Sequence, residues 1–171
     1  MVGVSLMKKC LYFICPTDCI ESTIQSTFHQ ENFFYSSLGN SVNFNECELN
    51  QAKQLICDKG IREISFILAD DNRIVLDALN EQRFLNVTGL KKFYSQVLLE
   101  KEYLEILWQI QNPHFLILSS FLNKKIEELK KGLSELMVGD FNLSGKIYRK
   151  KELKFDDIFS YKIYHEEFTL N

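Results

Sequence analysis

The side chains best suited to chemistry in this sequence follow two of its apolar runs. The segment Cys15–Cys19 begins and ends with a cysteine and directly follows the run that ends at Ile14. A polar cluster follows the run Ile64–Leu68. That cluster contains two carboxylates and a guanidinium, from Asp70, Asp71 and Arg73. Thiols and carboxylates bind metal ions, and an exposed thiol near a helix start can act as a nucleophile. The segments therefore predict a ligand crevice, with a metal site on Cys15, Cys19 and an aspartate as one interpretation.

Each of these residues also has a purely structural interpretation. Asp70, Asp71 or Asn72 can cap a following helix, and either aspartate can form an ion pair with Arg73. Cys10 and Cys15 can pack in a buried strand as small hydrophobic side chains. The histidines show no metal-binding spacing, and we interpret them as surface or capping residues: His29, His114 and His165.

The apolar runs predict the elements that position this crevice. Residues 10–15, 33–38 and 64–68 have the pattern of short buried strands, and a helical pattern follows each of them. Asp18 and Glu21 have the spacing of a capping box, and the helix 45–59 has Asn45 at its start and Gly60 after its end. Successive strand–helix units favour a parallel sheet with right-handed crossovers. Its carboxyl edge is where open α/β sheets bind ligands.

The second half of the chain predicts two long helices and a hairpin. The helices span 90–111 and about 114–136, and a lysine- and glutamate-rich run at 124–131 is interpreted as a solvated face. Alternation over 145–158 predicts a β-hairpin around a polar turn at 149–152, and 159–170 can form one more strand. We therefore predict one α/β domain over residues 1–171, with a central, mainly parallel sheet flanked by helices and a C-terminal hairpin.

Composition limits the classes of partner. The 171 residues carry a net charge of −3, which does not favour nucleic-acid binding, and 46% are hydrophobic. No apolar run approaches the roughly 18 residues of a membrane span. Five cysteines, an odd number with apolar or helical neighbours, favour reduced thiols and a cytoplasmic location.

Several landmarks, taken in order, make the sequence resemble the β-class carbonic anhydrases. That family has C-x-D-x-R after the first strand, R-N-x-G-N after the second, S-L-x-x-A in a helix, H-x-x-C after the third strand and a G-x-[VIL]-Y hairpin. Here Cys15 stands at the first cysteine, Gly39 and Asn40 match the second landmark, and Gly145–Tyr148 matches the hairpin. The helix landmark keeps only Leu49 and Ala52. The resemblance spans about residues 10–158 and implies the family fold.

The departures from the family pattern fall on its zinc site. The resemblance implies zinc held by two cysteines and a histidine, with an Asp–Arg pair gating the fourth position. Only Cys15 remains, because Asp70 stands at the histidine and Arg73 at the second cysteine. Thr17 replaces the gating aspartate and Cys19 its arginine. Without zinc no bound water is activated, so we expect no cofactor and no CO₂ hydration.

Two functions follow from this comparison. The first is a non-catalytic domain that binds a protein partner or a small molecule through the degenerate crevice. The second is an enzyme with altered chemistry, using a remodelled metal site or a reactive thiol at Cys15 or Cys19. The crevice candidates in both cases are the same: Cys15, Thr17, Cys19, Gly39, Asn40, Asp70, Asp71 and Arg73.

Aromatic residues predict self-association. The resemblance implies dimers that extend the sheet across their interface. Aromatic side chains present more apolar surface than one core can cover, in the segment Phe33–Tyr35 and at Tyr94, Tyr103 and Trp108. We therefore expect a homodimer.

Overall fold

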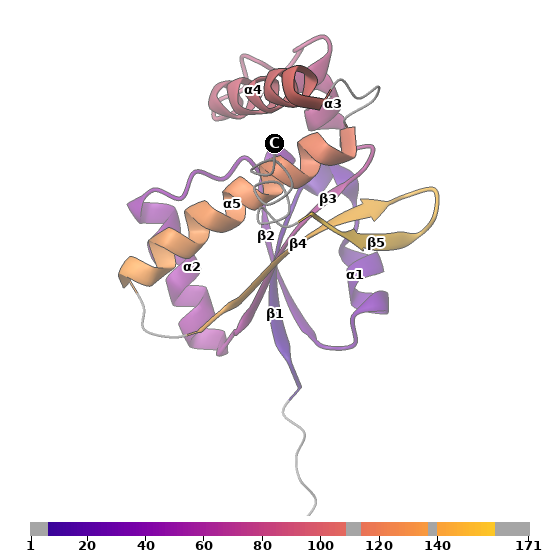
Figure 1. Cartoon of the computed structure of the whole chain (residues 1–171). Helices are drawn as coiled ribbons and strands as arrows, with labels where there is room; N and C mark the ends of the chain where they lie inside the picture. Colours follow the sequence, from indigo (N-terminus) through magenta and orange to yellow (C-terminus); the bar gives the residue numbers. More distant parts are fainter. Residues whose placement is uncertain (1–6, 109–113, 137–139, 160–171) are drawn as a thin grey trace, which may run out of the picture.

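A five-stranded sheet forms the centre of the protein, as the computed structural model shows for residues 7–108, 114–136 and 140–159 (Figure 1). The strand order is β2-β1-β3-β4-β5, the first four strands run parallel, and β5 pairs antiparallel with β4. The strand bounds are β1 Lys9–Ile14, β2 Glu31–Ser36, β3 Glu63–Ala69, β4 Asn142–Arg149 and β5 Lys154–Asp157. The predicted mainly parallel sheet and C-terminal hairpin are both confirmed.

Helices cover both faces of this sheet (Figure 1). They are α1 Glu21–Thr27, α2 Glu46–Lys59, α3 Arg73–Leu79, α4 Leu90–Trp108 and α5 His114–Leu136. The helix expected over 90–111 is described as far as Trp108, and residues 109–111 lie outside the described part. The strand expected over 159–170 also lies outside it, except for Phe159.

Alternation along the strands divides the core into two layers. Leu11 and Phe13 of β1 face one layer, which they share with apolar side chains of α2, α3, α4 and α5. Cys10, Tyr12 and Ile14 face the other, where α1 contributes Ile24. Successive strand residues point to opposite faces, so a strand that is covered on both sides is apolar throughout. The unbroken apolar runs in the sequence have this origin.

Local signals account for the bounds of α2. The Asn45 side chain accepts hydrogen bonds from the N–H groups of Cys47 and Glu48, at 2.9 and 3.2 Å. Gly60 ends the helix in the left-handed conformation with φ of 67°. Both residues act as the sequence predicted.

The charged run on α5 is only partly a solvated face, which corrects the sequence interpretation. Lys125 is 1% exposed and donates to the Val42 carbonyl at 3.0 Å and to the Glu128 carboxylate at 2.9 Å. Lys124 pairs with the buried Glu100 of α4. These lysines hold α5 to the rest of the fold, because each brings its charge to a partner below the surface.

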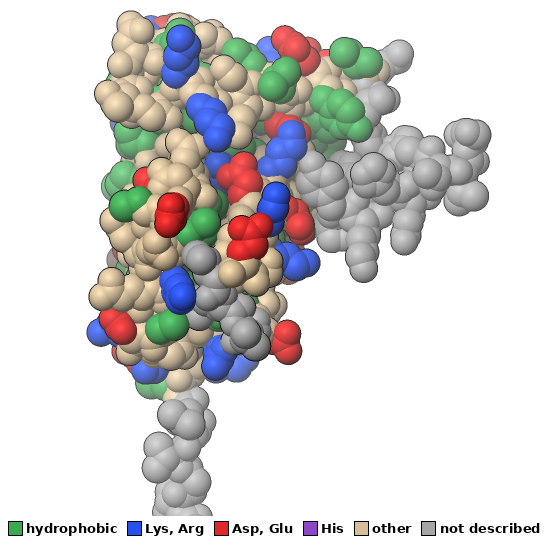
Figure 2. Space-filling model, turned by 90° about the vertical axis from the view of Figure 1, so that its left-hand side faces the viewer, with side chains coloured by type: hydrophobic (Ala, Val, Ile, Leu, Met, Phe, Trp, Pro, Cys, Tyr) green, Lys and Arg blue, Asp and Glu red, His purple; other side chains and the backbone are tan. Residues whose placement is uncertain are grey.

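Charges of both signs are mixed over the surface. Figure 2 shows lysine, arginine, aspartate and glutamate side chains interspersed on one face, without a large area of one sign. Among the described residues, no helix is both long and apolar enough to cross a membrane.

Candidate functional site

The predicted crevice residues gather at the carboxyl ends of the three neighbouring strands β2, β1 and β3. Gly39 and Asn40 follow β2, Cys15 follows β1, and Asp70 follows β3. The parallel register of these strands, with Phe13 opposite both Tyr35 and Phe66, brings their ends to one edge of the sheet. The sequence predicted this arrangement.

The Cys15 thiol lies fully buried at the centre of this edge. Its Sγ accepts a hydrogen bond from the Gly39 N–H at 3.0 Å and lies 3.0 Å from the Thr17 hydroxyl oxygen. The sulfur thus connects the turn after β1 with the turn after β2. Cys15 is engaged within the protein by two polar groups.

Gly39 and Asn40 hold the turn after β2 against the strands. Gly39 has φ of 61°, and a Cβ there would lie 2.7 Å from Cζ of Phe93. Asn40 is buried, and its side-chain N–H₂ donates to the carbonyls of Phe13 at 3.2 Å and Ile67 at 2.9 Å. The amide therefore links β1 to β3 near the carboxyl ends of both strands.

Asp18 is a buried site residue that the sequence analysis misassigned. The capping box expected from Asp18 is absent, because α1 starts at Glu21 with Ile20 at its N-cap and no side-chain cap. The Asp18 carboxylate instead accepts hydrogen bonds from the Ala69 N–H at 2.8 Å and the Asn72 amide at 2.7 Å. Burial raises the pKa of this carboxyl to about 6, although both hydrogen bonds act to lower it.

Asn72 completes the link between the turn after β1 and α3. Its Oδ1 accepts from the N–H groups of Ile74 and Val75, at 3.1 and 2.9 Å, and so caps the helix. Of the three polar residues expected to cap α3, it is therefore Asn72 that does so. Its amide nitrogen remains free to donate to Asp18, so one side chain serves both contacts.

Asp70 and Asp71 turn toward the β4–β5 hairpin. The Asp70 carboxylate accepts from the Lys150 N–H at 3.3 Å, and Asp71 pairs with the Lys150 ammonium at 3.4 Å. Neither forms the expected ion pair with Arg73, which starts α3 and is exposed. His114 Nε2 lies 2.6 Å from the Asp70 carbonyl oxygen. Hairpin and helix contacts thus occupy these residues.

The residues present do not fit the zinc ion that the resemblance implies. Within the described ranges, no three histidine, cysteine, aspartate or glutamate side chains form a group that could hold a metal ion. Cys19 is exposed and its Sγ donates to the Pro16 carbonyl at 3.5 Å, so the interpretation as a metal site on Cys15, Cys19 and an aspartate is wrong. Zinc needs three or four converging ligands, and here one thiol stands alone.

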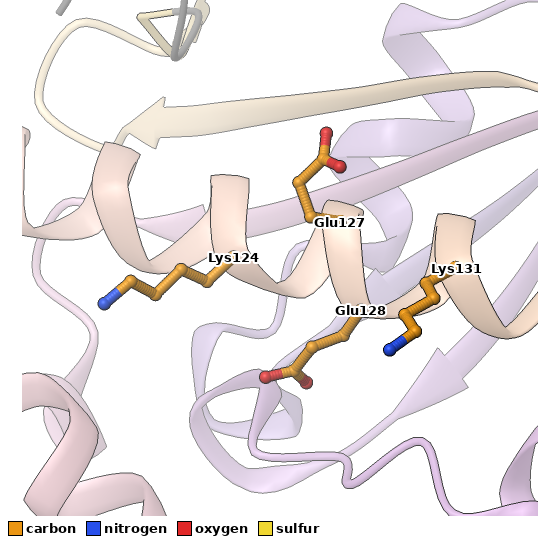
Figure 3. A pocket seen from close by; sticks show the side chains of 4 residues that line it. All are labelled: Lys124, Glu127, Glu128 and Lys131. Carbon is orange, nitrogen blue, oxygen red and sulfur yellow. The ribbon is translucent and has the colours of Figure 1, made fainter. Parts of the chain in front are cut away.

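A separate hollow of about 550 Å³ lies along α5 (Figure 3). Its lining residues are two lysines and two glutamates: Lys124, Glu127, Glu128 and Lys131. Figure 3 shows Glu127 pointing to the opposite side of α5 from Lys124 and Glu128. The two signs offset each other, so the hollow has no chemistry that would select an anion or a cation.

The fold is that of the β-carbonic anhydrases. Solved enzymes of that class match at low identity, which establishes the fold alone. The β-carbonic anhydrase CafD of the filamentous fungus Aspergillus fumigatus matches with a TM-score of 0.68 and 18% identity, covering 92% of each chain. The Coccomyxa enzyme in complex with acetazolamide gives 0.66 and 13%, covering 92% of this chain and 74% of the other. No family model and no curated protein matches the sequence.

A third match comes from an oligomeric enzyme. A tetrameric β-carbonic anhydrase of Sordaria macrospora has a TM-score of 0.65 at 12% identity, covering 90% of this chain and 82% of that one. The predicted resemblance to the class is thereby confirmed at the level of fold. The contact of Asp18 with Ala69 and Asn72 was missed, because the sequence signal of Asp18, a polar residue after an apolar run, is shared with ordinary helix caps.

Proposed function

We propose that this protein is a non-catalytic domain with a carbonic-anhydrase-like fold that binds a small molecule or a protein partner through its degenerate crevice. The observation that carries the proposal is the state of Cys15. Its sulfur accepts from the Gly39 N–H and contacts the Thr17 hydroxyl, while Asp70 and Arg73 stand where the resemblance expects zinc ligands. The resemblance implies a metal-bound sulfur at Cys15, whereas the Cys15 sulfur here is hydrogen-bonded within the protein.

Two buried polar atoms support a small polar ligand at this edge. Among the described residues, the Asn40 Oδ1 and Ser37 Oγ atoms are buried and have no hydrogen-bond partner. Buried polar atoms are nearly always paired, by protein or by ordered water. A ligand with an N–H or O–H group would satisfy Asn40 Oδ1. The other proposed crevice residues are Thr17, Cys19, Gly39 and Asp71.

Zinc content and the rate of CO₂ hydration test whether this protein lacks carbonic anhydrase activity. Protein purified without a metal-affinity step should contain no stoichiometric zinc by elemental analysis. Stopped-flow measurement should show CO₂ hydration at the background rate. About one zinc per chain, lost in Cys15→Ser, would contradict the proposal, because Cys15 is the one remaining family ligand.

A reactive thiol is the second candidate function, and the exposure of Cys19 favours it. Cys15 is fully buried, whereas Cys19 is exposed and lies two residues before α1. Alkylation by iodoacetamide, followed by mass spectrometry, measures its reactivity. Labelling of Cys19 much faster than of the exposed Cys47 and Cys57 would favour thiol chemistry, and equal rates would exclude it. All five cysteines lie in the described part of the chain and are free.

Two further properties belong to the proposal. We infer that the chain forms a homodimer, supported by exposed side chains such as Tyr103. Of the aromatic residues expected to lie outside the core, Tyr94 is instead buried in it, and the Trp108 side chain lies outside the described part of the structure. A single species of about 20 kDa by light scattering at tens of micromolar would contradict this. A cytoplasmic location is supported by five free cysteines, since thiols stay reduced there.

A further inference from the structure

A short turn after β1 covers the Cys15 thiol. The turn consists of Pro16, Thr17 and Asp18, and Cys19 ends it. Cys15 is fully buried, and its Sγ atom lies 3.0 Å from the Thr17 hydroxyl oxygen. Pro16 is exposed and Thr17 is half-buried, so the turn separates the sulfur from solvent on this side.

The Asp18 side chain holds this turn to the rest of the protein. Among the described residues, the hydrogen bonds between the turn and other elements both end on the Asp18 carboxylate. It accepts from the Ala69 N–H at 2.8 Å and from the Asn72 amide at 2.7 Å. The other hydrogen bonds of the turn, such as those from the Asp18 N–H and the Cys19 thiol, stay within residues 15–19. Release of one carboxylate would therefore free the whole turn.

The far end of the turn has a strained backbone. Cys19 has φ of 53°, in the left-handed region that residues other than glycine, asparagine and aspartate rarely adopt. The closed position of the turn thus depends on the contacts of Asp18 and is opposed by the backbone of Cys19. A rotation at Cys19 would relieve this strain as the turn moves away from the sheet.

The carboxylate that holds the turn is buried, and neutral N–H groups donate its hydrogen bonds. Asp18 is 3% exposed. The charged groups that face it from neighbouring elements are Asp71, before α3, and Lys150, in the turn between β4 and β5. These two pair with each other at 3.4 Å. Burial outweighs the hydrogen bonds and raises the pKa of the Asp18 carboxyl to about 6. The closed turn therefore favours the protonated carboxyl, and exposure to water favours the ionised one.

We propose that the turn Pro16–Asp18 is a pH-sensitive lid over Cys15, which is closed while the Asp18 carboxyl holds its proton and opens more readily once that proton is lost. The inference rests on the proposed crevice function and names how access to that crevice is regulated. Opening uncovers the Cys15 Sγ atom together with the Gly39 N–H that donates to it. The crevice is thus more accessible at neutral pH than in acid.

The direction of the pH effect follows from linkage. Below pH 3.8, the ordinary pKa of the group, Asp18 is protonated whether the lid is open or closed. As pH rises from there to about 6, the open form ionises first, so the ratio of open to closed lids increases. A difference of about two pKa units corresponds to an increase of about a hundredfold, and the ratio is level above that range.

Thiol labelling measures the lid without a ligand. The parent chain is labelled with 4,4′-dithiodipyridine between about pH 4 and 7, and mass spectrometry gives the rate at each cysteine. The Cys15 rate is divided by that of the exposed Cys47 in the same sample, which removes the intrinsic pH dependence of thiols. This quotient should rise by about a hundredfold in the parent chain. It should stay level in Asp18→Asn, because an amide does not ionise.

Two controls accompany this measurement. Asp71→Asn is the matched variant, because Asp71 lies near Asp18 but pairs with Lys150 at the surface. It should keep the rise of the quotient with pH. Circular dichroism across the pH range verifies that the parent chain and both variants stay folded.

Cys10 distinguishes opening of the lid from unfolding of the sheet. Cys10 is buried within β1, so its labelling requires loss of the sheet. Cys15 should react about tenfold faster than Cys10 or more, since a local opening costs less free energy than global unfolding. Its rate should also be unchanged in low concentrations of urea, because the lid exposes little surface when it opens.

The outcomes separate the lid from the proposed function. Equal rates at Cys15 and Cys10, with the same dependence on urea, would overturn the lid. A quotient that does not change with pH, or that rises equally in Asp18→Asn, would overturn the role of Asp18 and with it the proposal. Each of these results leaves the non-catalytic crevice standing. Stoichiometric zinc on Cys15 would instead overturn the proposed function, and elemental analysis detects it independently of labelling.

Discussion

The carboxylate of Asp18 accepts a hydrogen bond from the side-chain amide of Asn72 at 2.7 Å, between residues 54 positions apart in the sequence. Because Asn72 also caps α3, this bond joins the turn after β1 to the start of that helix. The second oxygen of Asp18 accepts from the Ala69 N–H at the end of β3. One buried carboxylate thus connects the turn after β1 with the end of β3 and the start of α3.

Asp18 should make stability depend on pH. Burial raises its folded-state pKa to about 6, above the ordinary 3.8. Between these values the folded protein holds a proton that the unfolded chain has lost. The contribution of Asp18 to the free energy of unfolding therefore falls by about 2 to 3 kcal/mol as pH rises from about 4 to 6, and is level above. Asp18→Asn should remove this decline in urea unfolding.

Other carboxyl groups also titrate in this range, so the comparison needs a matched variant. Asp58→Asn, at an exposed position of α2, should keep the decline that Asp18→Asn removes. If both variants show the same dependence on pH as the parent chain, Asp18 is not the group responsible.

Gly39→Ala should destabilise the fold by about 1 to 3 kcal/mol. The added Cβ would lie 2.7 Å from Cζ of Phe93, and the alanine would have to adopt a backbone φ of 61°. Gly60→Ala isolates the conformational part, because Gly60 has φ of 67° with no atom within 4 Å of the added Cβ. Thermal unfolding should show the larger loss for Gly39→Ala. Equal losses would mean that contact with Phe93 contributes nothing.

Lys125→Met should lower the free energy of unfolding by about 1 to 2 kcal/mol, because the buried Val42 carbonyl loses its donor. Methionine keeps most of the aliphatic side chain, so lost packing is a small part of the effect. Lys130→Met, at an exposed position on the same helix, serves as the control and should be close to neutral. Urea unfolding of the two variants measures the difference.

Asp70→His combined with Arg73→Cys should create zinc affinity. These changes restore the two missing ligands that the resemblance places at the ends of the strands beside Cys15, giving three soft or borderline ligands. Elemental analysis should then find about one zinc per chain, and none when Cys15→Ser is added to the pair. A folded double variant without zinc would show that the backbone does not place these positions as in the enzymes.

The order of strands and helices along the chain, the α2 caps and the gathering of Cys15, Gly39 and Asp70 at one edge of the sheet could all be predicted from the sequence. Those features depend on local patterns: apolar runs, a capping asparagine before Glu46, and Gly60 after Lys59. The positions of Cys15, Gly39 and Asp70 followed, because parallel strands align their carboxyl ends. Local chemistry and strand direction were sufficient for this level of description.

The partners of the polar groups depended on the tertiary structure. Asp18 has the sequence context of a helix cap but bonds Ala69 and Asn72, and Lys125 has that of a solvated lysine but lies buried against Val42. Asp71 pairs with Lys150, which is 79 positions away, rather than with the nearby Arg73. A hydrogen bond or ion pair forms with whichever group the packing brings within about 3 Å, and sequence separation carries no information about that distance.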